Sequence, residues 1–79
     1  MNLMAQKNFK YVICIENTDY PTSLEKRKLY EALPDTTASN RGFIRVIDES
    51  GEDYLYPSDY FIDANLTKET QAALTNVAF

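Results

Sequence analysis

The segment that most constrains the fold is a pair of short strand-like runs joined by a tight turn. The runs are residues 43–47 and 52–56, and both are rich in the β-branched and aromatic residues that favour strands. In the intervening Asp48-Glu49-Ser50-Gly51, Gly51 supplies the positive φ that a hairpin loop of about three or four residues needs, and Asp48 can accept a backbone donor. Pro57 ends the second run because proline cannot donate to a ladder. The segment therefore predicts a β-hairpin.

Three further strands are expected around this hairpin. Residues 9–15 alternate, with Phe9, Tyr11, Ile13 and Ile15 on one side and Val12 and Cys14 on the other, which indicates a strand with two apolar faces. A second strand over 29–33 is stopped by Pro34, and a short closing strand at 61–62 follows a 3₁₀ turn over 57–60. Residues 16–28 are expected to form a long polar loop anchored by Leu24, with room for a short helical turn at 24–28, and 36–40 a polar loop tip.

Near the C-terminal end of the chain, the spacing of apolar residues changes from that of a strand to that of a helix. A stripe at helical spacing predicts an amphipathic helix within residues 66–79, starting from Asn65 or Thr67 as N-cap: Leu66, Thr70, Ala73, Leu74 and Val77. A helix of about three turns is marginal alone. We therefore expect it to dock on the strands or on a second copy of the chain, which would make a homodimer.

Together these elements predict an all-β domain: a small five-stranded barrel of the Src-homology-3-like type with a short C-terminal α-helix. A five-stranded oligonucleotide-binding-type barrel is the second choice. The expected organisation is a flexible lead-in over 1–8, the barrel over 9–63 and the helical segment over 64–79.

A family resemblance supports this fold. The segment 24–35, LEKRKLYEALPD, followed by 45–57, RVIDESGEDYLYP, resembles a family of small uncharacterised bacterial and phage-borne barrel proteins, over roughly residues 9–63. The resemblance implies the Src-homology-3-like barrel and a bacterial source. It implies no biochemical activity.

Composition excludes several classes of function. The chain has 79 residues, no histidine and a single cysteine, Cys14, so no disulfide can form within it, and Cys14 is expected to be an apolar core residue. Neither a signal peptide nor an apolar run long enough for a membrane span is visible, so the expected location is cytoplasmic. We expect no cofactor and no metal.

Neither catalysis nor calcium binding is favoured. Without histidine the usual activated nucleophiles are missing, and acids at a hairpin tip are normally solvated, so no enzyme is expected. Asp48 and Ser50 match part of a calcium loop, but Gly51 comes two residues too early for the glycine at position six, and Asp59 stands at the glutamate position.

The tyrosines suggest a binding surface. Six are present, and tyrosine concentrates at half-exposed interfaces. The alternation of side chains along the two strands predicts that Leu55 lies in the core with Ile44 and Val46. It also predicts that Tyr54 and Tyr56 point outward beside Arg45. The predicted function is a non-enzymatic module that binds a protein, a peptide or its own copy, through a candidate surface of Tyr30, Arg45, Tyr54, Tyr56 and Tyr60. The alternative interpretation is that these tyrosines are only cross-strand pairs that stiffen the hairpin.

A second functional alternative is a single-stranded nucleic-acid binder. Lys26, Arg27 and Lys28 form the one basic cluster, and small barrels that bind single strands combine such a patch with stacking aromatics, which could here be Tyr30, Tyr54 and Tyr56. The net charge of −4 disfavours this, because an acidic chain repels phosphate on average.

Overall fold

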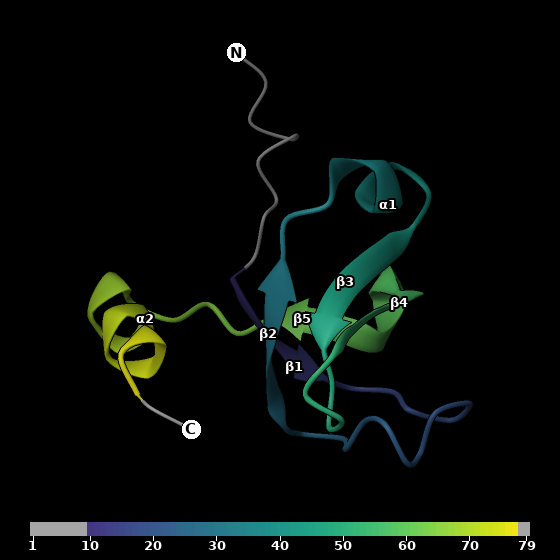
Figure 1. The fold of residues 1–79 in the computed structure, drawn as a ribbon, viewed down its shortest axis with the longest axis horizontal. Coiled ribbons are helices and arrows are strands. Elements are labelled where there is room, and N and C mark those ends of the chain that lie inside the picture. Colours follow the sequence, from purple (N-terminus) through teal and green to yellow (C-terminus); the bar gives the residue numbers. More distant parts are fainter. Residues whose placement is uncertain (1–9, 78–79) are drawn as a thin grey trace.

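A computed structural model describes residues 10–77 of the chain (Figure 1). Its five strands form one antiparallel sheet in the order β4-β3-β2-β1-β5, and they are β1 (Tyr11–Cys14), β2 (Leu29–Leu33), β3 (Phe43–Ile47), β4 (Asp53–Pro57) and β5 (Phe61–Asp63). Helix α1 (Thr36–Asn40) joins β2 to β3, and the 3₁₀ turn η2 (Ser58–Tyr60) joins β4 to β5. Helix α2 (Lys68–Thr75) follows the sheet. The mainly β fold with a C-terminal helix is confirmed, whereas the sheet does not close into a barrel, since no pairing joins β4 to β5 within residues 10–77.

Strand β2 is shared between two halves of the sheet. Its first residues, from Leu29 to Glu31, pair with β1, whereas Ala32 and Leu33 pair with β3. Strand β1 also pairs with β5, so β5, β1 and the start of β2 form one half, and the end of β2, β3 and β4 form the other.

The core joins the two halves. It contains residues from every strand and from the long loop: Val12, Cys14, Leu24, Tyr30, Ala32, Val46, Tyr56 and Phe61. The ring of Phe61 in β5 lies 6.2 Å from that of Tyr56 in β4 and 6.4 Å from that of Tyr30 in β2, edge to face in each case. Cys14 and Leu24 are fully buried, as the sequence predicts.

The register of the hairpin corrects one prediction. Arg45 lies opposite Leu55, and Ile44 lies opposite Tyr56. Residues directly opposite each other share a face of the sheet, so Tyr56 belongs with the core and Leu55 with Arg45. Leu55 is accordingly 43% exposed and Tyr56 only 3%. Assigning Leu55 to the core and Tyr56 to solvent was therefore wrong, because a shift of one residue in register turns every side chain of a strand over.

Among the turns and loops, one prediction is confirmed and two are corrected. Gly51 has a φ of 86°, which confirms its role in the turn. The predicted polar tip at 36–40 is instead the single-turn helix α1, capped by Asp35, whose carboxylate accepts from the Ala38 N–H at 2.9 Å. Residues 24–28 form a non-helical turn in which Arg27 has a φ of 72°, in place of the helical turn that the sequence allows there.

Helix α2 is shorter and less buried than its sequence stripe suggests. Thr67 is the N-cap, accepting from the Thr70 N–H, and none of the helix residues is buried. Of the stripe, Leu66 and Leu74 are half-buried, while Val77, beyond the helix end, is 54% exposed. The expected helix segment beyond residue 77 and the lead-in over residues 1–8 lie outside the described residues. Figure 1 shows α2 standing beside the strands rather than across them.

Candidate functional site

Aromatic side chains from three segments meet at one side of the hairpin. Tyr20 comes from the long loop, Tyr56 from β4 and Tyr60 from η2. The ring of Tyr20 lies 5.0 Å from that of Tyr56 and 6.2 Å from that of Tyr60, both edge to face. Such pairs add roughly 0.5–1.5 kcal/mol beyond area burial. The loop is therefore held against the hairpin by its tyrosine.

The floor of this region is a buried carboxylate, Asp48. It accepts hydrogen bonds from the Tyr56 hydroxyl at 2.5 Å, the Ser50 hydroxyl at 2.6 Å and the Ser50 N–H at 2.8 Å. Burial alone would raise the pKa of Asp48, but these hydrogen bonds outweigh it and the pKa is lowered. Burial, followed by the bond to Asp48, raises the pKa of Tyr56 to about 12. At neutral pH the pair is thus an anion held by a neutral phenol.

Above this floor lies an exposed apolar and aromatic surface. We define the tyrosine surface as Tyr20, Tyr54 and Tyr60; Tyr54 is 50% exposed and Tyr60 is half-buried. A hollow of about 360 Å³ opens among Tyr20, Tyr54 and Leu55, and Asp48 and Tyr56 form part of its wall. Its volume lies within the roughly 300–1,000 Å³ of ligand pockets.

Carboxylates flank the tyrosine surface. The Tyr60 hydroxyl donates to Asp19 at 2.9 Å, and the Tyr54 hydroxyl donates to Glu52 at 3.2 Å. These bonds raise the pKa values of Tyr60 and Tyr54, so both phenols stay neutral beside their carboxylates. The surface presents aromatic rings with negative charge at two of its edges.

The predicted surface residues do not form one surface. Tyr30 and Tyr56 are buried in the core, so their assignment to an exposed surface was wrong. Tyr54 and Tyr60 do lie in the same region, together with Tyr20, which the prediction omitted. The only sequence signal for Tyr20 was its place before Pro21 in a long loop. The buried Tyr56 nevertheless supports the surface from below.

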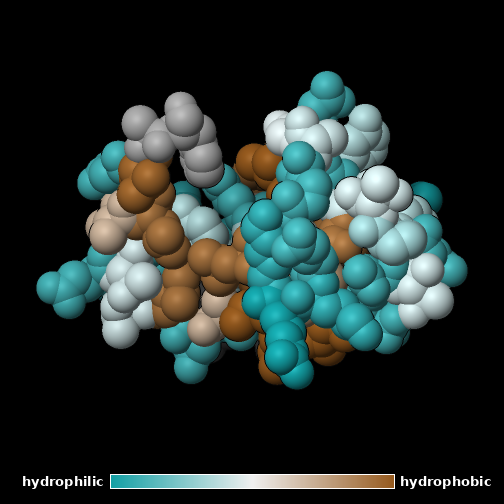
Figure 2. All heavy atoms as spheres, turned by 90° about the horizontal axis from the view of Figure 1, so that it is seen from below, coloured by the Kyte–Doolittle hydropathy of each residue, from teal (hydrophilic) through white to brown (hydrophobic). Residues whose placement is uncertain are grey.

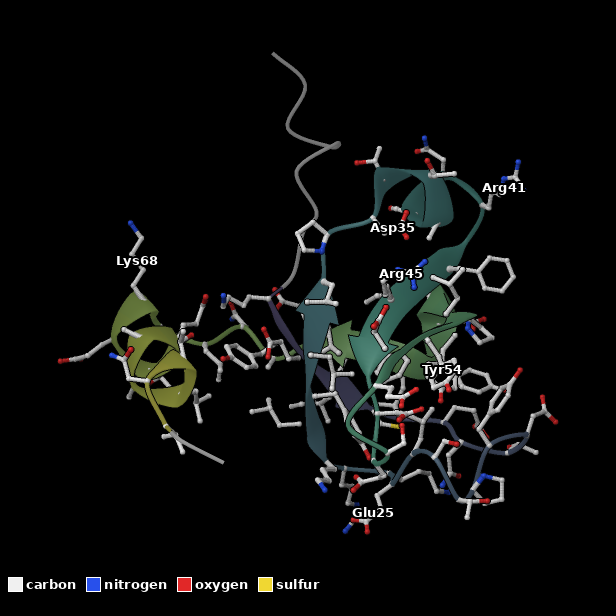
Figure 3. All side chains as sticks on the ribbon, in the orientation of Figure 1. Glu25, Asp35, Arg41, Arg45, Tyr54 and Lys68 are labelled. Atoms are coloured by element: carbon white, nitrogen blue, oxygen red, sulfur yellow. The ribbon has the colours of Figure 1, made fainter. Side chains whose placement is uncertain are left out.

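Arg45 has a structural partner on either side. Its Nε donates to Asp35 at 2.9 Å and its Nη1 donates to Asp53 at 2.9 Å. Figure 3 shows Arg45 beside Asp35 below α1, with Tyr54 further along the hairpin. The Ala38 N–H and then Arg45 lower the pKa of Asp35. Arg45 therefore ties α1 to the hairpin and stands apart from the tyrosine surface.

The basic cluster is divided. Lys28 forms an ion pair with Glu49, with its Nζ 2.6 Å from Oε2, and lies 5.7 Å from the centre of the Tyr30 ring. Tyr30 donates to the same carboxylate at 2.5 Å. Lys26 and Arg27 are exposed in the turn before β2, and no ion pair involves them within residues 10–77. Of the three tyrosines that could stack on bases beside this cluster, Tyr30 and Tyr56 are buried and only Tyr54 is exposed.

The single cysteine of the chain, Cys14, lies in the core. Burial raises the pKa of the Cys14 thiol, which donates to the Glu16 carbonyl at 3.2 Å, so the thiolate nucleophile is disfavoured. In the part of the chain that the structure describes, no cluster of three or more acids and cysteines is arranged to hold a metal ion. None of the described helices has the length and apolar character to cross a membrane.

Comparisons with known proteins leave the site to be interpreted from its own geometry. No protein-family model, curated protein or solved structure matches the chain.

Proposed function

We propose that this chain is a non-enzymatic interaction module that binds a protein or peptide partner through the tyrosine surface. One observation carries the proposal: the exposed rings of Tyr20 and Tyr54 line a hollow whose wall includes the hydrogen-bonded pair Asp48 and Tyr56. Tyrosine binds partners at low entropic cost because it orders few side-chain torsions and offers both a ring and a hydroxyl.

The charges around the tyrosine surface favour a partner of particular chemistry. Asp19 and Glu52 flank the rings, and the chain as a whole carries a net charge of −4. Aromatic faces attract cations, and nearby carboxylates strengthen that preference. The expected partner segment is apolar with at least one lysine or arginine.

For the fold, we propose that the bent sheet is an open form of the Src-homology-3-like barrel. The division of β2 between two half-sheets supports this, as does the contact of Phe61 with Tyr56, which brings β5 and β4 together across the core. In such an arrangement the long loop and the hairpin flank one side of the barrel, which is where the tyrosine surface lies.

The test is selection of binders from a displayed library of random linear peptides, followed by titration of the synthetic peptides. Tyr54→Ala should weaken binding by tenfold or more, as expected for loss of an interface tyrosine worth about 1–2 kcal/mol. Phe43→Ser is the matched control, because Phe43 is an exposed aromatic outside this surface. The variants should melt within a few degrees of the parent protein. Equal weakening of binding by Tyr54→Ala and Phe43→Ser, or no weakening by either variant, would contradict the proposal.

A mixed-sequence single-stranded oligonucleotide is the comparison probe for the alternative function. We expect weak binding at physiological salt, because Lys28 is already neutralised by Glu49. Micromolar binding that falls steeply with added salt and is lost in Lys26→Glu would favour the nucleic-acid interpretation instead.

A further inference from the structure

The outer face of the half-sheet formed by β5, β1 and β2 carries a row of apolar side chains. The register sets Ile62 of β5 opposite Ile13 of β1, and Ile13 opposite Leu29 of β2. Residues directly opposite each other share a face of the sheet, so these three side chains form one row across the three strands. Ile62 is 55% exposed, while Ile13 and Leu29 are half-buried. We call these three residues the outer row.

The outer row lies on the face of the half-sheet opposite the core. The core residues of the same three strands are the sequence neighbours of the row: Val12, Cys14, Tyr30 and Phe61. An antiparallel sheet with one face in the core commonly presents polar residues to water on the other face. Here the second face is apolar as well, and contiguous exposed apolar patches mark sites of interaction.

The segment around α2 forms a side wall next to the outer row. A hollow of about 290 Å³ lies between β2 and α2; Leu29 and Glu31 line it on the sheet side, and Leu74 and Val77 line it on the other. Figure 1 shows α2 beside the strands, and Figure 2 shows hydrophobic side chains running from the side of the molecule that carries α2 toward the sheet. Leu29 belongs to both the row and the hollow. We call the two together the outer groove.

The backbone beneath the outer groove is already paired. Strand β1 pairs with β2 on one side and with β5 on the other, so no further strand can join it. An occupant of the groove must therefore be held by its side chains. An extended peptide lying flat on apolar side chains would bury N–H and C=O groups without partners, which is costly. An α-helix pairs its own backbone groups, so the groove favours a helix.

The charge of the groove indicates the composition of that helix. Glu31 follows Leu29 by two residues in β2 and so lies on the same face. It is half-buried, and no ion pair involves it within residues 10–77. Among the described residues that line the hollow beside α2, it is the only charged one. A carboxylate in an apolar groove favours a partner with a cation at the matching position.

The same charge disfavours a second copy of the chain as the occupant. Two copies that meet through the same face would bring the Glu31 carboxylates of both into one interface. Like charges brought together in an interface cost binding free energy, and the net charge of −4 on each chain adds to the repulsion.

We propose that the outer groove binds an amphipathic α-helix of a partner protein. The apolar stripe of that helix packs on Ile13 and Ile62 and enters the hollow beside Leu74, and a lysine or arginine at the edge of the stripe meets Glu31. Amphipathic helices laid into hydrophobic grooves are a recurring form of peptide recognition. The outer groove is separate from the tyrosine surface and does not depend on the function proposed for that surface.

The probes are three synthetic amphipathic peptides of about 18 residues, long enough to form a helix. All three have leucines at the positions of one apolar stripe. They differ only in the residues that flank the stripe, which are lysine in the first peptide, glutamine in the second and glutamate in the third. In a titration of the labelled peptides with the full chain, followed by fluorescence anisotropy, the lysine peptide should bind at least tenfold more tightly than the glutamate peptide.

Ile62→Thr tests the apolar contact. Threonine keeps the β-branch that suits a strand and removes apolar surface from an exposed position, so binding of the lysine peptide should weaken by about fivefold or more. Leu55→Thr is the matched control, because Leu55 is an exposed apolar residue of β4, at the opposite edge of the sheet. Leu55→Thr and Tyr54→Ala should leave binding unchanged, and the second of these separates the groove from the tyrosine surface.

Glu31→Lys tests the charge. It should reduce the preference for the lysine peptide over the glutamate peptide by tenfold or more, because the cation then meets a like charge. Glu25→Lys is the matched control: it makes the same change in net charge at an exposed position in the turn before β2. It should reduce that preference by less than about threefold.

A further measurement leaves the protein unchanged, in case a variant fails to fold. In methyl NMR spectra of the full chain, saturation with the lysine peptide should shift the signals of Ile13 and Ile62. The signals of Ile44, which packs against the core in the other half of the sheet, should stay in place.

Three results would overturn the proposal: unshifted Ile13 and Ile62 signals at saturation, equal weakening by Ile62→Thr and Leu55→Thr, or equal effects of Glu31→Lys and Glu25→Lys. A full chain that sediments as a dimer, and as a monomer in Ile62→Thr, would assign the groove to a second copy instead. Loss of binding in Tyr54→Ala alone would assign the peptide to the tyrosine surface and reject the groove.

Discussion

The shorter of the two helices, α1, is more firmly attached to the sheet than the longer helix, α2. Helix α1 has only five residues, yet Ala38 is buried against the sheet and Asp35 both caps the helix and accepts from Arg45 of β3. Helix α2 has eight residues, a threonine cap and an acid in its first turn, but no buried residue. Its one hydrogen bond to a strand joins the Thr75 and Tyr11 hydroxyls at 3.2 Å.

The comparison shows what makes a short helix part of a small domain. Both helices have an N-cap side chain bonded to the third residue that follows it. Caps satisfy free N–H groups at the start of a helix, but isolated helices of this length are not stable in water. Attachment of the cap to the sheet, as Asp35 is attached through Arg45, distinguishes α1 from α2.

The largest expected effect comes from removing the α1 cap. Asp35→Ala deletes the bond to the Ala38 N–H and the bond from Arg45, and we expect the melting temperature to fall by about 5–10 °C. Thr67→Ala is the matched cap deletion in α2. It should reduce helical circular dichroism while changing the melting temperature by less than about 3 °C. Equal shifts in melting temperature for the two variants would remove the distinction between the helices.

Acid should destabilise the folded protein through carboxylates whose pKa values are lowered by their contacts, and one of these carboxylates is the α1 cap, Asp35. The folded protein lowers the pKa values of Asp35, Asp48 and Glu49 relative to the unfolded chain. The unfolded chain therefore binds protons first as pH falls, and the stability contributed by these groups, complete above about pH 5, is lost through and below about pH 4. Asp35→Asn keeps a capping side chain but cannot titrate, so its stability should fall less steeply with acid. Parallel pH curves for the two proteins, measured by urea denaturation, would exclude Asp35 as a contributor.

The smallest expected effect concerns removal of α2. Deleting residues 66–79 should lower the melting temperature by less than about 3 °C, because no helix residue is buried, and should leave sedimentation that of a monomer. A fall of more than about 8 °C, or a melting temperature that depends on protein concentration in the full chain, would instead support docking of the helix on the strands or on a second copy. The docking expected from the sequence stays a prediction until this is measured.

Much of the secondary structure could be predicted from the sequence, because it depends on local chemistry. Alternation and β-branched residues marked the strands, Gly51 marked the hairpin turn with its positive φ, and Pro57 marked the end of β4. Thr67 was one of two expected caps for α2. These signals act over a few residues and need no partner from elsewhere in the chain.

Only part of the candidate surface could be predicted from the sequence, because the signals in the sequence are local. Alternation says that Tyr54 and Tyr56 share a face, but not whether that face is the one of Val46 or of Arg45. The backbone bond from the Asp48 N–H to the Glu52 carbonyl sets the register, and that register sends Tyr56 into the core. Tyr20 joins the surface only because its loop folds back onto Tyr56 and Tyr60.

The sequence by itself thus determined which segments form the five strands, the hairpin turn and the C-terminal helix, because backbone preferences and side-chain period are local properties. Only the tertiary structure decided which tyrosines are exposed and that a polar tip becomes α1. Each of these depends on a contact between residues of different elements: Asp35 with Arg45, and Asp48 with Tyr56. Such contacts carry no signature in the neighbouring sequence, since they are selected by the packing of the whole chain.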